Sequence, residues 1–596
     1  MSSLSRQVSR QSSASDQSSQ QSIASSYGSA EQNLFEQLKR RVVTSDKKKN
    51  THQLSQFSFL PRDAISEIIT REVVNQADTA WLSSWYNSLF NKTRATQILE
   101  RALKVFTALG LCEEETVIWS LFDEGITDDD LPLERWEDEK QLGISKILVS
   151  RSGKRFESFL KLKRRNVAVE NFLQSQWLVL APTLTTSGEH IRVDGQVPLP
   201  IYDIKELRET RSRSTVYKGK IHAAHLKPGA KEPMRVAIKD YHSLGEEEFK
   251  QERENLETIQ KLRHRHLIWH VVTIEQGDAR YAVFPWARGG NLSDLWQRDP
   301  RATAAREPAL LAWCLRQMAG IVDALFALHE VNCRHGDLKP ENILHFHALP
   351  DDRAVAAATS AAAAVVRDDG DDDGADERRR YGTLVVADVG VSRVHHQATE
   401  LRSDPTNTKA TTPCYEAPEA EFGGRGPRRR RYDMWSVGCI FMEFLVWQLY
   451  GADAIDRFKE QRRPGGGTGS TANGNGGGGG GGHNRNGSGS GSRYGSRGAA
   501  YYEIAADGTP AVHPAVVRAL AALRGDPRCA PGTGLAAVLD LIAGKLIVVN
   551  PDERAQADAL RDQFREIVRR AEADPDYLMT RTEPPPEIPD VFASSG

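Results

Sequence analysis

The sequence predicts an α+β protein in which an all-α accessory region precedes a domain of mixed strands and helices. Three observations carry this prediction. Apolar residues recur at spacings of three and four between about residues 55 and 180, which is a helical period. An alternating strand pattern near residue 237 directly precedes an amphipathic helix, and a continuous apolar run near residue 385 is typical of a buried strand.

The composition excludes several classes of protein. The 78 Lys and Arg residues nearly balance 80 Asp and Glu residues, so the formal charge is −2 and the whole chain makes no electrostatic case for binding nucleic acid. The six cysteines show no paired spacing, which argues against a disulfide framework and a zinc module. The N-terminus lacks the apolar stretch of a secretory signal, and no apolar run approaches the length of a membrane span. We therefore expect an intracellular protein, cytoplasmic or nuclear, with no membrane span.

Composition also divides the chain into segments. Residues 1–50 are rich in Ser and Gln and are expected to form a disordered tail, whereas 51–195 form the helical accessory region. The Asp-rich stretch 351–380 and the Gly-rich stretch 464–500 are expected to be insertions in surface loops, because long loops cost little extra closure entropy. Residues 573–596 are expected to be a C-terminal tail.

Three helices are expected in the accessory region. Pro61 and Asp63 are typical of a helix start and precede apolar positions from Ile65 to Val73. A second helix covers the apolar positions 98–109 and ends at Gly110, and a third covers residues 113–122. No catalytic motif occurs here, so the region is a candidate module for binding a protein partner.

The first chemical signal is Lys239, which ends the alternating strand Arg235–Lys239. An amphipathic helix follows over residues 247–262, and Glu252 lies one turn before the apolar Leu256. A carboxylate at that position could form an ion pair with the strand lysine. Glu254 would serve instead if the helix were rotated, and the sequence leaves both open.

The strongest signal is the segment Cys333–Asn342, which reads CRHGDLKPEN. Asp337, Lys339 and Asn342 bring a carboxylate, an ammonium group and an amide into one loop. Phosphoryl transfer needs a base for the attacking hydroxyl, a cation near the moving phosphoryl group and oxygen ligands for magnesium. Asp388, which follows the apolar run 384–387, supplies a second oxygen ligand at the end of a strand.

These motifs occur in the order and nearly the spacing of one family. Residues 201–572 resemble the eukaryotic protein kinase catalytic domain of the serine/threonine type. The resemblance implies a two-lobed fold with a small β-rich N-lobe and a large helical C-lobe. Lys339 and the segment Thr412–Glu419 favour serine/threonine over tyrosine substrates. The resemblance also implies that Arg554 pairs with Glu419.

The resemblance implies roles for individual residues and two cofactors, ATP and Mg²⁺. Asp337 would act as the base that deprotonates the Ser or Thr hydroxyl of a protein substrate during its phosphorylation, and Lys339 would offset transition-state charge. Asn342 and Asp388 would hold the metal, and Glu252 would hold Lys239. The implied nucleotide-binding residues are Val216, Ala237, Lys239, Glu252, Phe284, Pro285, Trp286 and Ala287.

Three departures from the family pattern keep a second interpretation open. The glycine-rich loop has Glu209, Arg211 and Ser214 where glycines would let the backbone approach phosphate. Val389 replaces a phenylalanine. Gly336 replaces a buried arginine, so we expect activity without a phosphate on the activation segment. The alternative to an active kinase is a pseudokinase scaffold that binds partners without efficient phosphoryl transfer.

Overall fold

The computed structural model divides the chain into two compact units. The first unit holds residues 1–244 and 271–284, and the second holds 245–270 and 285–596, so the chain passes between the units after residues 244, 270 and 284. The described residues are 33–44, 57–77, 88–136, 147–162, 165–208, 214–242, 244–298, 308–347, 380–389, 413–422, 430–463, 498–581 and 587–593. Predictions for residues 1–32, 209–213, 351–379 and 464–497 lie outside them.

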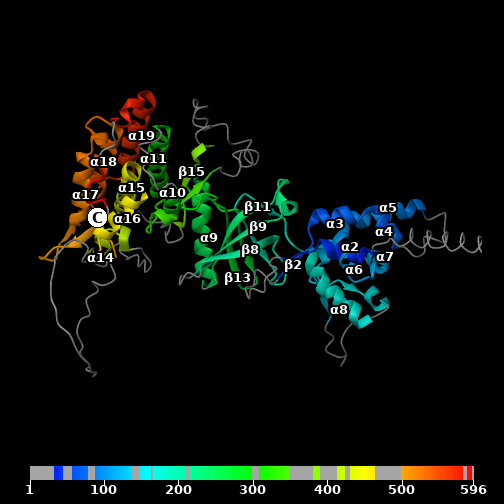
Figure 1. Ribbon diagram of the computed structural model, residues 1–596. Helices are drawn as coiled ribbons and strands as arrows, with labels where there is room; N and C mark the ends of the chain where they lie inside the picture. The colour runs from blue at the N-terminus through cyan, green and yellow to red at the C-terminus, as the bar shows by residue number, and fades with distance from the viewer. Residues whose placement is uncertain are drawn as a thin grey trace, which may run out of the picture. The chain divides into compact units, whose positions relative to one another are not determined.

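Helices dominate the accessory part of the first unit (Figure 1). Their apolar faces share one core, which includes Leu38, Ile98, Phe106, Leu109, Leu121 and Phe172. The helices are α2 (Leu34–Arg41), α3 (Arg62–Ile68), α4 (Arg71–Gln76), α5 (Ser88–Arg101), α6 (Leu103–Gly110), α7 (Ile118–Asp123) and α8 (Arg165–Ser175).

The accessory region departs from the prediction in several places. The helix expected over positions 98–109 is divided at Ala102 between α5 and α6. Helix α2 lies inside the predicted disordered tail, because Asn33 caps it and Leu38 is fully buried in the core. The helix expected across residues 65–73 is divided, since the Thr70 side chain accepts a hydrogen bond from the Val73 N–H and starts α4. The region is also not all-α: β3 (Leu133–Arg135), β4 (Leu148–Ser150) and β5 (Arg155–Phe156) form an antiparallel sheet. Strands of two or three residues are too short to show a period of two.

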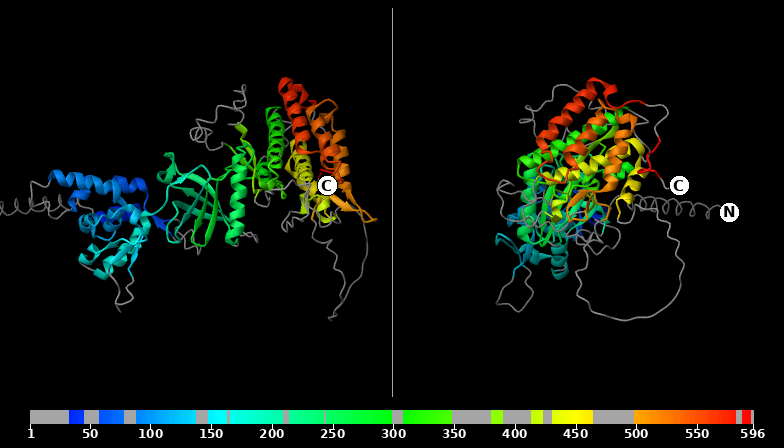
Figure 2. Two further views of the ribbon diagram at one scale, coloured as in Figure 1. Left: turned by 180° about the vertical axis from the view of Figure 1, so that it is seen from behind. Right: turned by 90° about the vertical axis from the view of Figure 1, so that its left-hand side faces the viewer.

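A six-stranded sheet completes the first unit (Figure 2). Its first strand, β7, comes from the accessory side of the chain and runs parallel to β12, a pairing that the sequence did not predict. The order is β7 (Glu189–Val193), β12 (Val272–Gln276), β13 (Ala279–Pro285), β11 (Met234–Asp240), β9 (Thr215–Ile221) and β8 (Ile201–Arg208).

The accessory helices are joined to this sheet through histidine. The Arg62 N–H at the start of α3 donates to Nε2 of His225 at 3.2 Å, and Nδ1 of His225 lies 2.9 Å from the Pro182 carbonyl, to which it donates. The ring of Phe59 meets His225 edge-on with centroids 5.4 Å apart. Two pairs of short strands lie nearby, namely β1 (Val43–Thr44) with β2 (Ser58–Phe59) and β6 (Leu184–Thr185) with β10 (Leu226–Lys227).

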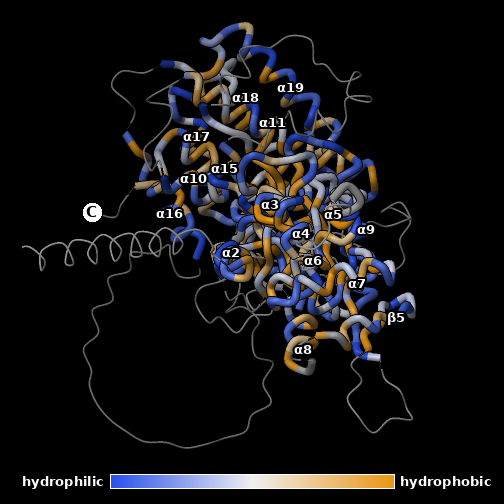
Figure 3. Tube along the Cα trace, turned by 90° about the vertical axis from the view of Figure 1, so that its right-hand side faces the viewer, coloured by the Kyte–Doolittle hydropathy of each residue, from blue (hydrophilic) through white to orange (hydrophobic). Residues whose placement is uncertain are grey.

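The second unit is mainly helical and is built around α15, in which every residue from Tyr432 to Tyr450 is buried. Figure 3 shows hydropathy alternating along α19, as expected for an amphipathic helix that packs against α11. Its helices are α9 (Glu246–Lys261), α10 (Leu292–Arg298), α11 (Pro308–Glu330), α14 (Glu419–Phe422), α15 (Arg431–Tyr450), α16 (Ala452–Gln461), α17 (Pro514–Gly525), α18 (Gly534–Leu541) and α19 (Ala557–Ala573).

Among the described helices, α11 is long and apolar enough to cross a membrane by length and composition. Its side chains instead contact protein: the Trp313 indole N–H donates to the Gly382 carbonyl at 2.9 Å, and Gln317 accepts from the Leu384 N–H at 2.9 Å. The helix therefore has the surroundings of a core helix, and its hydropathy does not indicate a membrane span.

Short strands and the chain end complete the second unit. The pairs are β14 (Ile343–Phe346) with β15 (Thr383–Val386) and β16 (Tyr502–Ile504) with β17 (Pro510–Val512). Two predicted boundaries need correction. The expected insertion 464–500 ends earlier, because Ala499 and Ala500 are buried. The expected C-terminal tail is partly core, because Phe592 is buried and stacks on Tyr450 with ring centroids 5.0 Å apart.

Candidate active site

The loop predicted to carry the chemistry is held by Asp433, in the first turn of the buried helix α15. Its carboxylate accepts hydrogen bonds from the backbone N–H groups of His335 at 2.8 Å and Gly336 at 2.9 Å. His329 Nε2 lies 3.0 Å from the same carboxylate. Burial alone would raise the pKa of the Asp433 carboxyl, but the hydrogen bond and charge of His329 hold that pKa below its usual value. The loop is thus fixed from beneath by an ionised group.

The three polar residues of this loop converge. The Lys339 ammonium donates to Asp337 Oδ2 at 2.8 Å, and the Asn342 amide nitrogen donates to the Asp337 backbone carbonyl at 2.8 Å. The Asp337 and Lys339 side chains are 11% and 22% exposed, so both reach the surface of the second unit. A carboxylate, a cation and an amide therefore share one rigid turn.

Asp388 is attached to the same loop by two backbone contacts of its predecessor, Ala387. The Ala387 N–H donates to the Asn342 carbonyl at 2.8 Å, and His335 Nε2 donates to the Ala387 carbonyl at 2.9 Å. Asp388 itself is exposed and has a positive φ of 58°, a conformation that re-aims the chain after β15. Val389, at the position of the missing phenylalanine, is buried at 2% exposure, so its apolar packing role is retained.

Asn342 and Asp388 fit a magnesium site by their chemistry. Because the Asn342 amide nitrogen is bonded to the Asp337 carbonyl, its oxygen is the atom left for a cation. Magnesium usually takes one or two protein oxygens, with phosphate and water as its other ligands. No group of three or more His, Cys, Asp or Glu side chains that could hold a metal occurs in the described ranges.

Helix α9 carries the predicted partner of the strand lysine. Glu252 is buried on α9 at 8% exposure, whereas Glu254 is exposed, so the helix phase is the one that favours Glu252. The segment after α9 runs along β15: the Ile268 N–H donates to the Val386 carbonyl at 2.9 Å. Glu252 and Asp388 therefore belong to elements that are joined within the second unit.

The predicted nucleotide contacts of the first unit lie on one face of its sheet. Lys239 pairs directly with Val216 across β11 and β9, and Ala237 lies two residues before Lys239 on the same face. Val236 and Ile238 are buried on the opposite face. Phe284 and Pro285 end β13, and Trp286 and Ala287 follow it. Phe284 and Trp286 are half-buried, and Pro285 and Ala287 are buried.

One residue that the sequence did not single out lies beside the catalytic loop. Arg334 is buried at 6% exposure, and its guanidinium carbon lies 4.0 Å from where a Cβ at Gly336 would stand. It also lies 5.8 Å from the centre of the Tyr432 ring. A buried cation is thus present near position 336, so Gly336 alone no longer argues for independence from phosphorylation. The sequence could have indicated Arg334, because it is an arginine only two residues before Gly336.

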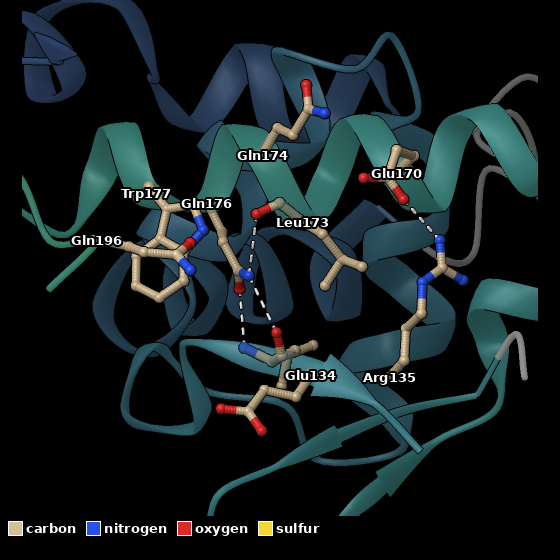
Figure 4. A pocket seen from close by; sticks show the side chains of 9 residues that line it. Glu134, Arg135, Glu170, Leu173, Gln174, Gln176, Trp177 and Gln196 are labelled. Atoms are coloured by element: carbon tan, nitrogen blue, oxygen red, sulfur yellow. Dashed lines mark hydrogen bonds and ion pairs between the residues drawn. The ribbon is translucent and has the colours of Figure 1, made fainter. Parts of the chain in front are cut away.

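A pocket of about 470 Å³ lies elsewhere, in the accessory region (Figure 4). The Gln176 side chain exchanges hydrogen bonds with the Leu133 backbone N–H and carbonyl at 2.8 and 3.0 Å, and Arg135 forms an ion pair with Glu170 at 2.7 Å. None of the predicted site residues lines it. Gln176 and Arg135 are thus bonded to other residues of the pocket wall.

Comparison with known proteins agrees with these observations. Residues 218–462 match the family model of the protein kinase domain. Serine/threonine-protein kinase H1 from Homo sapiens is 26% identical over 239 residues, which are 40% of this chain and 45% of that protein. Serine/threonine-protein kinase nekl-2 from Caenorhabditis elegans is 25% identical over 231 residues, 38% of this chain and 52% of that protein.

A calcium/calmodulin-dependent protein kinase from Metarhizium anisopliae is 28% identical over 191 residues, 32% of this chain and 38% of that protein. The matches thus span about half the length of these relatives or less. The family model covers the segment that contains the predicted catalytic loop. Residues 218–462 thus carry a protein kinase domain, and the relatives that this chain resembles are serine/threonine-protein kinases.

Proposed function

We propose that this chain transfers the γ-phosphoryl group of ATP to Ser or Thr hydroxyls of protein substrates. The observation that carries the proposal is the contact of Lys339 with Asp337 at 2.8 Å in a loop that Asp433 anchors. A positioned carboxylate beside a fixed cation is what a reaction needs when it removes a hydroxyl proton while negative charge moves between oxygens.

Within this proposal Asp337 orients the acceptor hydroxyl and takes its proton. Lys339 offsets charge on the phosphoryl group as it reaches that hydroxyl. Because Asp337 and Lys339 share one turn, the base and the cation keep a fixed relative position. Little movement of these side chains is then needed during transfer. Asn342 supports the turn through the Asp337 carbonyl at 2.8 Å and keeps its amide oxygen for a metal.

The remaining assignments concern the nucleotide. Asn342 and Asp388 would hold Mg²⁺, which would neutralise phosphate charge when bound. Lys239 would contact the α- and β-phosphates and would be held by Glu252, while Val216 and Ala237 would cover the adenine. Phe284 and the backbone of residues 285–287 would border the adenine edge.

The second candidate function is a pseudokinase scaffold, favoured by the absence of glycine at Glu209, Arg211 and Ser214. Without those glycines the backbone approaches phosphate less closely. The two functions differ in whether nucleotide binding is followed by transfer, so both steps need to be measured.

The test is phosphoryl transfer from labelled ATP with magnesium to dephosphorylated casein, with Asp337→Asn as the matched control. Transfer that disappears in the control supports the enzyme. Magnesium-dependent ATP binding without transfer supports the scaffold. Replacing Glu209, Arg211 and Ser214 together with glycine should then tighten ATP binding or raise the rate, because the loop regains its close approach to phosphate.

A further inference from the structure

A buried carboxylate in α15 joins three segments of the second unit that are distant in sequence. Glu443 is fully buried. Its Oε2 accepts from the Tyr415 hydroxyl at 2.8 Å, and its Oε1 accepts from Arg462 Nη2 and from the Tyr501 hydroxyl, each at 3.1 Å. Tyr415 lies in the segment 413–422, whereas Arg462 and Tyr501 lie on either side of the Gly-rich insertion. Glu443 is thus the shared acceptor of both regions.

Arg462 is held by two aromatic rings and by hydrogen bonds from Nε and Nη2. Its guanidinium carbon lies 3.9 Å from the Phe458 ring centre and 4.0 Å from the Tyr501 ring centre, so aromatic rings cover the planar group. Its Nε donates to the Ala499 carbonyl at 3.1 Å, which links the two ends of the insertion. A guanidinium fixed in this way has one position for its charge.

The charge of Arg462 decides what Glu443 can do. A buried carboxylate stays ionised only where a cation and hydrogen-bond donors compensate it. An ionised carboxylate accepts hydrogen bonds at both oxygens, whereas a protonated one gives up an acceptor site. Burial and then the charge of Glu443 raise the pKa of Tyr415 well above its usual value, so its phenol stays protonated and donates. The Tyr415 hydroxyl therefore depends on Arg462 through Glu443.

Tyr415 in turn fixes the course of its segment. Its hydroxyl is bonded to Glu443 at one end, and its backbone carbonyl accepts from Ser436 Oγ at 2.8 Å at the other. Tyr415 lies three residues after Thr412, and its segment leads into α14. A change in this tyrosine would displace a segment that Ser436 attaches to α15, one turn after Asp433, which holds the loop of Asp337 and Lys339.

We propose that Arg462 and Tyr501 are positioning residues for the acceptor protein. They act through Glu443 on Tyr415, and so the two borders of the Gly-rich insertion set the affinity for the Ser- or Thr-containing substrate segment. The inference rests on the proposed function, because it concerns the binding of the acceptor in that reaction. Arg462 would act on the substrate only through Glu443 and Tyr415, without contacting it.

The test compares Arg462→Met and Tyr501→Phe with two matched controls in the same unit. Arg528 is also buried, paired with Asp526 at 2.7 Å, and the Tyr450 hydroxyl donates to Asp526 at 2.6 Å. Neither contact involves Tyr415, so Arg528→Met and Tyr450→Phe reproduce the loss of a buried cation and of a buried phenol. Two quantities are measured in the full chain: the KM values for dephosphorylated casein and for ATP, and hydrogen–deuterium exchange of residues 413–422.

Arg462→Met and Tyr501→Phe should raise the KM for casein by about three- to tenfold, the effect of one net hydrogen bond, and leave the KM for ATP unchanged. Exchange in residues 413–422 should become faster in these two variants and not in the controls. Unchanged casein KM and exchange, or equal changes in all four variants, would overturn the inference. If Arg462→Met does not fold, the comparison of Tyr501→Phe with Tyr450→Phe decides it.

The exchange measurement also separates this inference from the proposed function. If the unaltered protein shows no transfer to casein, the proposed function fails, yet the exchange comparison still reports whether Arg462 and Tyr501 position residues 413–422. If transfer occurs and the exchange is unaffected, the proposed function stands and the positioning role is rejected.

Discussion

The guanidinium of Arg554 binds the carboxylate of Glu419 through two parallel hydrogen bonds, with Nη1–Oε1 at 2.7 Å and Nη2–Oε2 at 3.0 Å. The two residues are 135 positions apart in the sequence. The Arg554 side chain is fully buried and that of Glu419 is 17% exposed. Arg554 also donates to the Val548 and Arg431 carbonyls, so it ties the start of α14 to the start of α15. The predicted pairing of these residues is confirmed.

Replacing Arg554 with Met should therefore destabilise the second unit. Removing one partner of a buried pair leaves an uncompensated charge, which typically costs about 3–5 kcal/mol. Urea unfolding of the full chain measures the loss. Arg569→Met is the control, because the Arg569–Glu566 pair is exposed and its removal should leave the unfolding midpoint nearly unchanged. Equal midpoints for the Arg554 variant and the wild type would contradict the prediction.

Asp337→Asn should reduce phosphoryl transfer by about 10²–10⁴-fold, because an amide cannot accept the hydroxyl proton. The fold should survive, since Asn has nearly the same shape and can still meet Lys339. The rate with labelled ATP and the melting temperature are measured together. Asp558→Asn, at an exposed position in α19, controls for a general effect of losing a carboxylate. A purified Asp337→Asn protein with the wild-type rate would remove Asp337 from its role.

Deleting residues 464–497 behind a short Gly/Ser bridge should leave the melting temperature nearly unchanged. Glycine-rich sequence of this kind contributes little apolar surface to a core. Extending the deletion to residue 500 should lower the melting temperature, because Ala499 and Ala500 are buried and the Ala499 carbonyl accepts from Arg462 at 3.1 Å. The two deletions differ by only three residues, so they test the corrected boundary directly. Equal melting temperatures for the two deletions would show that the insertion extends to residue 500.

Acid should weaken the first unit through His225. Burial lowers the pKa of His225 to about 4, and His222, Arg62 and Asp63 are the charged groups nearby. Because its folded pKa lies below the unfolded value of 6.5, the unfolded state binds the proton first. Stability is therefore full above pH 6.5 and falls as the pH drops toward 4, by on the order of 2–3 kcal/mol for this group.

His225→Gln tests this pH dependence. The variant should be less stable at pH 7, because one amide cannot serve both the Arg62 N–H and the Pro182 carbonyl in the same geometry. It should also lose less stability between pH 7 and pH 5 than the wild type, since glutamine does not titrate. Unfolding midpoints at both pH values give the comparison. Parallel slopes for the two proteins would show that His225 is not the titrating group.

Local spacing allowed much of the candidate site to be predicted. Asp337, Lys339 and Asn342 lie within six residues, so a single turn brings them together whatever the rest of the chain does. The period of the strand at Val236 and Ile238 likewise places Ala237 and Lys239 on the other face. The choice between Glu252 and Glu254 needed the structure, because it depends on which side of α9 is buried.

The contacts that only the tertiary structure decided join distant parts of the chain. The strand β7 pairs with β12 in the sheet, although 78 residues lie between Val193 at the end of β7 and Val272 at the start of β12. Glu443, Arg462, Tyr501 and Tyr415 each look like an ordinary residue in sequence and meet only in the folded unit. The sequence by itself determined the chemistry of the catalytic loop, because neighbouring residues fix one another's positions through the backbone. The tertiary structure decided which buried charged side chains meet. The distances between them depend on how whole helices and strands pack, and the local hydrophobic periodicity of the sequence carries no information about that packing.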